Sequence, residues 1–302
     1  MSRLFFYMLM KSLTRFNHFV IRRIESRITK FRVNLRSQGY VLLTVSLLFM
    51  MSCAQNEPPK SQLTVMSYNI AAGFGDIDGI ANVIAEANPD VVGLQEVDVH
   101  WGERSGFINQ AEYLGAALNM HTFFAEIYTL DPDSIHLPAK RYGLAFLSKY
   151  EFVTTKNHTL SRLSTQTEPP ELIQLPGFAE IAIEKDGKIV RLFNTHLDYR
   201  SDPSVRKTQI QEMFEIMGDL DDAIVLMGDL NAQPHAPELG PVFAAFEDSW
   251  KDKNDPGYTF PGDDPVRRID YIMHTKSMKS SDSKVIQSAK SDHAPVMTIL
   301  EF

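Results

Sequence analysis

Six short clusters of Asn, Glu, Asp and His residues stand along the chain, each where a run of apolar residues ends. Binding and catalytic side chains are often carried by such segments at the ends of buried strands. Carboxylate and amide oxygens suit a hard cation such as Mg²⁺ or Mn²⁺, and imidazole exchanges protons near neutral pH. The clusters are Tyr68-Asn69-Ile70, Leu94-Gln95-Glu96-Val97, Asn194-Thr195-His196-Leu197-Asp198, Gly228-Asp229-Leu230-Asn231-Ala232, Arg268-Ile269-Asp270-Tyr271 and Ser291-Asp292-His293-Ala294-Pro295.

Each cluster also has an ordinary structural explanation when it is taken alone. Gly228-Asp229-Leu230-Asn231 has the composition of a turn, and Ser291-Asp292-His293 is compatible with a solvated loop. Six such clusters in one domain are much harder to explain as unrelated turns. We therefore interpret them as parts of a single site that is assembled from several strand ends.

In this order the clusters resemble the metal-dependent endonuclease/exonuclease/phosphatase superfamily. That superfamily includes pancreatic deoxyribonuclease, abasic-site endonucleases, neutral sphingomyelinases and inositol-polyphosphate phosphatases. The resemblance extends from about Thr64 to Val296, and its most specific part is Gly-Asp-Leu-Asn combined with Ser-Asp-His-x-Pro. It implies an α/β fold, a four-layer αββα sandwich of two mixed β-sheets flanked by helices, with the site at one sheet edge.

The resemblance also implies how a metal and a water molecule would be held. Glu96 matches the main carboxylate ligand of a Mg²⁺ or Mn²⁺ ion, assisted by Asn69 and Asp292. Mg²⁺ commonly takes only one or two protein carboxylates, so this small set is sufficient. Asp229 matches the residue that positions or deprotonates the attacking water.

Three further residues match those that contact the phosphate, and a fourth matches one that orients a histidine. Asn231 corresponds to a residue that holds a phosphate oxygen, and His293 to the histidine on the scissile phosphate, with Asp270 fixing its tautomer. His196 corresponds to a second phosphate contact or general acid. Abasic-site endonucleases generally lack this last histidine, so the resemblance favours the deoxyribonuclease-like, sphingomyelinase-like and phosphatase branches.

Two arginines are additional candidates for substrate binding. Arg104 lies in Glu103-Arg104-Ser105-Gly106, and Arg141 precedes Tyr142-Gly143. The planar guanidinium suits bidentate contacts to phosphate, although arginines are also common on protein surfaces.

The charge of the chain is very unevenly distributed. The 302 residues have a formal charge of -8, yet residues 1–40 contain nine basic side chains and one acid, for a net +8. The remainder therefore has 21 basic and 37 acidic residues, or -16. A domain with this negative charge argues against a broad basic surface that binds long duplex nucleic acid. The same charge is compatible with a cluster of carboxylates that binds a metal ion.

The basic segment runs into the apolar residues 40–52 and then into Cys53, the only cysteine. The apolar run is shorter than the roughly 20 residues of a bilayer-spanning helix, and the pattern is typical of a secretory signal. Together with Cys53 it resembles the lipidation site of a bacterial lipoprotein; an uncleaved signal anchor is the alternative. We expect a signal peptide with lipidation cysteine over 1–53, a tether over 54–62, and a catalytic domain over 63–302 in the cell envelope.

A single cysteine excludes an internal disulfide and a Cys-rich zinc site. Apolar patterns predict a first helix capped by Asp78 and ended by Asn88-Pro89, a weaker helix over 110–118, and a third helix that starts near Pro203. Strands are predicted over 63–70, 91–95, 142–148, 178–183, 189–195, 224–227, 268–273 and 295–300, with a hairpin turn at 185–188.

The leading functional expectation is a metal-dependent hydrolase of phosphoester bonds, of phosphodiesterase or nuclease type. The alternatives are a membrane-tethered lipid head-group phosphodiesterase, sphingomyelinase-like or related to glycosyl-phosphatidylinositol, and a non-catalytic envelope binding module. The expected partners are a phosphoester substrate (lipid head group, nucleic acid or small molecule) and the membrane; no obligate protein partner is evident.

Overall fold

The structure, a computed structural model, describes residues 61–302. The predicted signal segment, Cys53 and residues 54–60 of the predicted tether lie outside the described residues. Within 61–302, no helix is both long and apolar enough to cross a membrane.

The first β-sheet contains six strands in the order β11-β12-β1-β2-β4-β3. The central pair β1 and β2 is parallel, and the other pairs are antiparallel, so the sheet is mixed. The strands are β1 (Gln62–Asn69), β2 (Val91–Val99), β3 (His121–Leu130), β4 (Lys140–Ser148), β11 (Lys279–Val285) and β12 (Val296–Glu301).

The second sheet also contains six strands, in the order β5-β6-β7-β8-β10-β9. Its central pair β7 and β8 is parallel, which makes this sheet mixed as well. The strands are β5 (Phe152–Leu163), β6 (Leu172–Lys185), β7 (Lys188–His196), β8 (Ile224–Asp229), β9 (Glu247–Asp248) and β10 (Asp270–His274).

Alternate residues of the strands face two different apolar layers. In β1, Leu63 and Val65 enter the core between the sheets, whereas Met66 and Tyr68 pack on the opposite side. The inner core joins both sheets, because it also contains Ile181 and other residues of the second sheet. The period of two along each strand therefore produces one shared core and two outer apolar faces.

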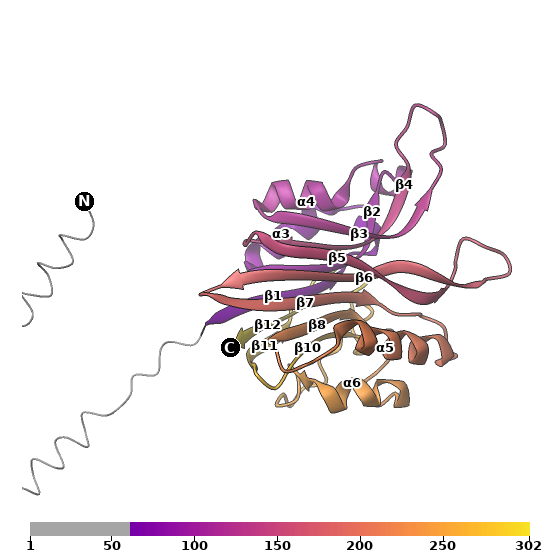
Figure 1. Cartoon of the computed structure of the whole chain (residues 1–302). Helices are drawn as coiled ribbons and strands as arrows, with labels where there is room; N and C mark the ends of the chain where they lie inside the picture. Colours follow the sequence, from indigo (N-terminus) through magenta and orange to yellow (C-terminus); the bar gives the residue numbers. More distant parts are fainter. Residues whose placement is uncertain (1–60) are drawn as a thin grey trace, which may run out of the picture. The chain divides into compact units, whose positions relative to one another are not determined.

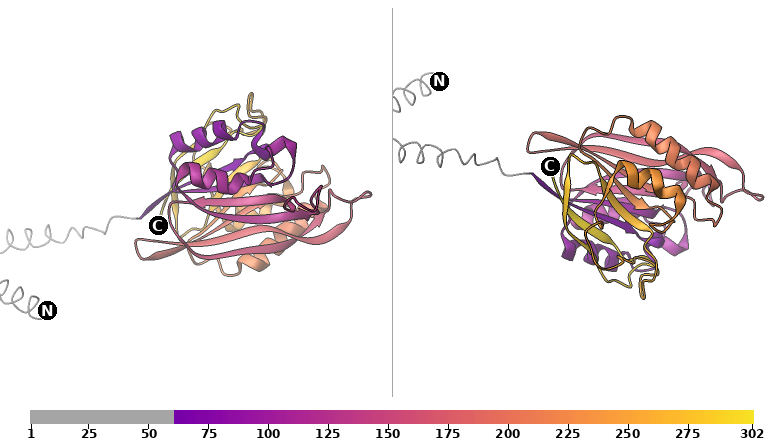
Figure 2. Two further views of the ribbon diagram at one scale, coloured as in Figure 1. Left: turned by 90° about the horizontal axis from the view of Figure 1, so that it is seen from above. Right: turned by 90° about the horizontal axis from the view of Figure 1, so that it is seen from below.

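Helices cover both outer faces (Figures 1 and 2). Helices α3 (Ile77–Ala87) and α4 (Gln110–Leu118) bury residues such as Ile80 and Leu114 against the first sheet. Helices α5 (Ser204–Met217) and α6 (Gly240–Ala245) pack on the second sheet through residues such as Met213 and Val242. The three 3-10 helices are η1 (Ala71–Gly73), η2 (Glu103–Ser105) and η3 (Pro237–Leu239). The predicted four-layer αββα sandwich is confirmed.

The predicted strands and helices are all present, but several details differ. Strands β3, β5, β9 and β11 and helix α6 were not predicted. Much of β5 and β11 is exposed and carries no regular apolar alternation. The predicted cap Asp78 is wrong: Asp76 caps α3 by accepting a hydrogen bond from Gly79 N at 2.8 Å. Asp78 lies in the first turn instead and accepts a hydrogen bond from the Tyr113 hydroxyl.

Candidate active site

The strand register brings the polar clusters to one edge of the two sheets. Asp229, the last residue of β8, lies opposite His196 at the end of the parallel strand β7. On its other side Asp229 lies opposite Asp270, the first residue of the antiparallel strand β10. In the first sheet, Asn69 at the end of β1 pairs with Gln95 of β2. Carboxyl ends of parallel strands meet at one edge, which explains why distant clusters converge here.

Glu96 owes its position to an irregularity in β2. The pairing of β2 with β4 shifts between Leu94 and Val97, and Glu96 has a left-handed φ of 56°. Such a bulge redirects a side chain that the regular pleat would aim elsewhere. The Glu96 carboxylate is half-buried among fully buried neighbours, and its Oε1 accepts a hydrogen bond from Asn69 Nδ2 at 3.0 Å.

Asn69 is fully buried and connects two carboxylates. Its Nδ2 donates to Glu96 Oε1 at 3.0 Å and lies 3.2 Å from Asp229 Oδ2. Its Oδ1 accepts the backbone N–H of Ala71 at 3.1 Å, which fixes the orientation of the amide because a backbone N–H can only donate. Asn69 therefore orients Glu96 and Asp229 through its NH₂ group.

His293 and Asp270 form a buried pair. His293 Nδ1 lies 2.8 Å from Asp270 Oδ2, which also accepts the Thr259 hydroxyl at 2.5 Å. The imidazole packs edge-on against Phe260, with ring centroids 4.9 Å apart. Burial opposes the charged imidazole, but Asp270, Asp229 and Asp292 outweigh it and raise the pKa of His293 to about 10. The protonated ring therefore presents an Nε2–H group at neutral pH.

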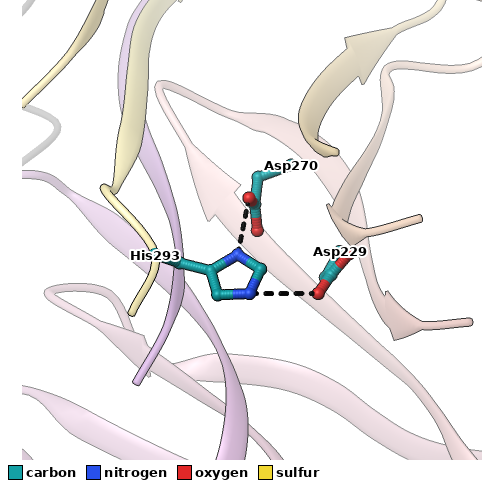
Figure 3. Close-up of side chains that lie close together, drawn as sticks. All are labelled: Asp229, Asp270 and His293. Atoms are coloured by element: carbon teal, nitrogen blue, oxygen red, sulfur yellow. Dashed lines mark hydrogen bonds and ion pairs between the residues drawn. The ribbon is translucent and has the colours of Figure 1, made fainter. Parts of the chain in front are cut away.

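The Nε2 atom of His293 lies 3.7 Å from Asp229 Oδ2, and His196 Nε2 lies 3.6 Å from the same oxygen (Figure 3 shows the His293 side). Asp229 Oδ1 accepts the backbone N–H of Asn231 at 2.8 Å. Burial and the charge of Asp270 raise the pKa of Asp229 to about 6. Asp229 is thus a carboxylate flanked by two imidazoles, with an affinity for protons that is higher than usual.

Asn231 follows β8 in a left-handed conformation, with φ of 49°. Its Nδ2 donates to the backbone oxygen of Leu197 at 3.0 Å, which ties the ends of β7 and β8 together. Both Asn231 and His196 line the cavity at this edge.

Asp292 lines the same cavity as Glu96. Burial raises the pKa of Asp292, and the negative charge of Glu96 raises it further. Ser291 anchors the segment by donating its hydroxyl hydrogen bond to Asn69 O at 2.7 Å. Within residues 61–302 neither Glu96 nor Asp292 forms an ion pair with a basic side chain. Two carboxylates at one cavity without a protein cation fit a divalent metal ion.

Asp229, Asp270 and His293 also bring one potential ligand atom each within 4.8 Å of one another. In this trio, however, Asp270 Oδ2 already accepts hydrogen bonds from Thr259 and His293. The Glu96 and Asp292 carboxylates therefore offer the more open oxygen ligands.

A cavity of about 540 Å³ is lined by Glu96, His196, Asp229, Asn231, Asp292 and His293. Aromatic side chains form one wall, where Trp101 contacts Tyr142 at 5.7 Å between ring centroids and Tyr142 stacks on Tyr128 at 6.2 Å. Arg104 lies over Trp101 and lines the cavity, held by a bidentate ion pair with Asp98. Hydrogen bonding to Asp98 raises the pKa of Arg104.

The two arginine candidates are placed differently. Arg104 is at the cavity, whereas Arg141 lies over the Phe124 ring and is not among the residues that line it. Sequence reasoning missed Arg162 and Arg267, which do line the cavity together with Arg200. Arg162 and Arg267 lie outside the polar clusters at predicted strand ends, so their place at the site depends on how distant segments pack.

Comparisons with known proteins agree with this geometry. The family model described as Endonuclease/Exonuclease/phosphatase family matches residues 66–293. A similar solved structure is an endonuclease/exonuclease/phosphatase from Beutenbergia cavernae, with a TM-score of 0.63 and 23% identity, covering 80% of this chain and 72% of that one. No protein with a curated description matches the sequence significantly.

Two further solved structures share the fold. The mannosyl-6-phosphatase of Bacteroides thetaiotaomicron has a TM-score of 0.57 and 20% identity, covering 80% of this chain and 100% of that one. The human Nocturnin catalytic domain, solved with a bound sulfate anion, has a TM-score of 0.56 and 19% identity, covering 82% and 99%. Because the family model spans most of the chain and the fold agrees, this protein belongs to the Endonuclease/Exonuclease/phosphatase family.

Proposed function

We propose that the protein is a divalent-metal-dependent hydrolase of phosphoester bonds, of the phosphodiesterase or nuclease type. The observation that carries the proposal is the convergence of Glu96, Asp229 and the Asp270–His293 pair at one cavity. Hydrolysis of a phosphoester requires charge neutralisation, an activated water and a proton for the leaving oxygen. The site contains a group suited to each requirement.

The residues that would hold Mg²⁺ or Mn²⁺ are Glu96 and Asp292, with Asn69 orienting the Glu96 carboxylate. Oxygen ligands of this kind are typical of Mg²⁺ sites that take one or two carboxylates. When bound, such an ion supplies positive charge to a phosphate oxygen.

Asp229 is the group best placed to accept a proton from water. Its raised pKa makes the carboxylate a stronger base than an exposed aspartate, although it is still ionised above about pH 6. The backbone N–H of Asn231 and the Asn69 amide hold its two oxygens. Asp229 is thereby fixed in direction, so that it can orient a water molecule in the cavity.

His293 and His196 are suited to contacts with the phosphate. The charge of Asp270 keeps His293 protonated, so its Nε2–H group stabilises negative charge that develops on phosphate oxygens. His196 lies on the other side of Asp229 and is partly accessible from the cavity. We assign it the second phosphate contact and the proton donation to the leaving oxygen.

The cavity favours a small phosphoester or a head group over a long duplex. Its volume of about 540 Å³ and its aromatic wall match a single organic group. The strongly acidic domain disfavours extended contacts with nucleic-acid backbones. One neighbour in fold is named a mannosyl-6-phosphatase, which supports a small phosphoester as the first class to test.

We further propose that the protein is an exported lipoprotein of a bacterial cell envelope, attached through Cys53. The basic segment, the apolar run 40–52 and the cysteine after it support this placement. Labelling cells with a fatty-acid analogue tests it: label on the wild type that is lost in Cys53→Ala is expected. Absence of label, or label that survives the substitution, would contradict lipid attachment.

Activity is tested on the full-length protein purified in detergent. Bis-p-nitrophenyl phosphate, plasmid DNA and sphingomyelin are each offered with Mg²⁺, Mn²⁺ or EDTA. We expect metal-dependent turnover of at least the first substrate, which is lost in His293→Ala and retained in the exposed control His121→Ala. A protein that binds these substrates without metal-dependent turnover would instead be a binding module.

A further inference from the structure

Arg162, near the end of β5, is a nearly buried cation at the edge of the cavity. Only 7% of its surface is exposed, and it contributes to the cavity lining. Its Nη1 donates to His196 O at 2.8 Å and its Nη2 to Gly177 O at 2.7 Å. The guanidinium is therefore held by two backbone carbonyls near the turn end of the β5–β6 hairpin, close to the backbone of His196.

Unlike comparable arginines, Arg162 has no carboxylate partner. Arg206, with 5% exposure, pairs with Glu238 at 2.7 Å, and the buried Arg268 pairs with Asp248. Among the ion pairs within residues 61–302, none includes Arg162, and its buried Nε has no acceptor. Burial lowers its pKa to about 10, so the side chain is still cationic at neutral pH.

A buried charge without a counterion is costly, and an anion in the cavity would offset that cost. The planar guanidinium is well matched to phosphate oxygens. The same cavity is also lined by the carboxylates Glu96, Asp229 and Asp292, which repel an anion when no metal is present. The Arg162 guanidinium is therefore a better contact than this carboxylate cluster for an anionic group that is not the one being hydrolysed.

Arg162 shares its cavity with the aromatic wall described above. Tyr128 and Tyr142 stack there, and the Tyr128 hydroxyl accepts the backbone N–H of Thr165 at 3.1 Å. Gln166 is exposed and lines the same cavity. Polar groups and an aromatic face thus stand beside one unpaired cation.

We propose that Arg162 binds a second phosphate group of the substrate, so that the enzyme selects phosphoesters that carry an additional phosphate beside the one it cleaves. The expected preference among substrates rests on the proposed hydrolase function, whereas the binding of phosphate by Arg162 does not. The second phosphate belongs either to a small bisphosphorylated molecule or to the neighbouring position of a single nucleic-acid strand.

The binding test does not depend on turnover. Inorganic phosphate is titrated calorimetrically into the full-length protein in detergent with EDTA. We expect binding to the wild type that weakens at least about 10-fold in Arg162→Met, because an unscreened charge-assisted contact is lost. Gln166→Glu is also expected to weaken phosphate binding. Because it leaves Arg162 in place, it serves as a second variant if Arg162→Met fails to fold. The control Lys188→Met removes an exposed cation at the other end of β7 and leaves phosphate binding unchanged.

The kinetic test uses the 4-nitrophenyl ester of thymidine 5′-phosphate, with and without a 3′-phosphate. The wild type is expected to prefer the 3′-phosphorylated ester in kcat/KM, and Arg162→Met to lose that preference. A short single-stranded oligonucleotide is the third substrate. If it is preferred over the small ester, the second phosphate comes from a nucleic-acid strand, and the reverse order identifies a small molecule.

Two results would overturn the proposal. One is phosphate binding that is absent from the wild type or equal in wild type and Arg162→Met. The other is a kcat of Arg162→Met that falls equally for both esters, while the ratio of their kcat/KM values stays that of the wild type. This result is expected if Arg162 only holds the His196 carbonyl. Failure of the proposed hydrolase function is recognised separately, as absence of metal-dependent turnover, and leaves the phosphate titration decisive for Arg162.

Discussion

The Asp270–His293 pair gives the sharpest prediction about individual side chains. The substitution Asp270→Asn keeps an oxygen that can accept from His293 Nδ1 and from the Thr259 hydroxyl, which now lie 2.8 and 2.5 Å from Oδ2. It removes the negative charge that helps to raise the pKa of His293. The side chain is buried, so solvent does not replace that charge.

The size of the effect follows from the hydrogen bond that changes. A bond between charged groups contributes about 1.5–3 kcal/mol and a neutral one about 0.5–1.5, so the loss is about 1–2 kcal/mol. Because about 1.4 kcal/mol corresponds to a tenfold change in rate, kcat is expected to fall about 10-fold or somewhat more. KM changes little, because His293 acts mainly on charge that develops during the reaction.

The assay is steady-state hydrolysis of bis-p-nitrophenyl phosphate by the full-length protein with saturating Mg²⁺. Thr259→Val is the matched control, since it removes a neutral donor to the same oxygen and leaves the carboxylate, and a smaller loss of kcat is expected. Urea unfolding of both variants separates a loss of stability from a loss of catalysis. If Asp270→Asn keeps the wild-type kcat while His293→Ala is inactive, the charge of Asp270 has no role in the reaction.

Three other predictions concern stability and substrate binding. A Cβ on Gly228 would lie 2.0 Å from Thr195 O, and the φ of this residue is 137°. Gly228→Ala should therefore lower the free energy of unfolding, measured in urea, by about 2 kcal/mol or more. Gly218→Ala, where a Cβ meets open space, should lower it less. Burial lowers the pKa of His274, so its contribution to folding stability is present above about pH 6.5 and is lost as the pH falls. Between about pH 7.5 and 5, the melting temperature of His274→Gln should therefore fall less than that of the wild type. Arg104→Lys should raise KM about 3-fold or more with kcat unchanged, because lysine cannot reproduce the bidentate bond to Asp98. An unchanged KM would place Arg104 outside the substrate-binding surface.

Much of the site was predictable because its residues follow apolar strands. Asn69, His196 and Asp229 are each the last residue of a buried strand, and Asp270 is the first of another. Strand ends that face one edge of packed sheets must lie near each other, so their chemistry was visible in the order of the motifs.

The remaining features depend on contacts that leave no local pattern. Strands β5 and β11 are polar because one or both faces are exposed, so periodicity could not reveal them. Arg162 looks like any surface arginine in the sequence, and its burial results from packing against the carbonyls of Gly177 and His196. Thr259 is similar, since its bond to Asp270 joins a loop to a strand.

A Mg²⁺ titration of bis-p-nitrophenyl phosphate hydrolysis tests whether the activity depends on a metal ion held by Glu96. We predict that EDTA abolishes turnover of the full-length protein and that Mg²⁺ or Mn²⁺ restores it. In Glu96→Gln the Mg²⁺ concentration for half-maximal rate should rise at least about 10-fold, with the exposed Glu103→Gln as an unchanged control. Turnover that persists in EDTA, or the same Mg²⁺ requirement in Glu96→Gln and wild type, would show that Glu96 does not hold a catalytic metal ion.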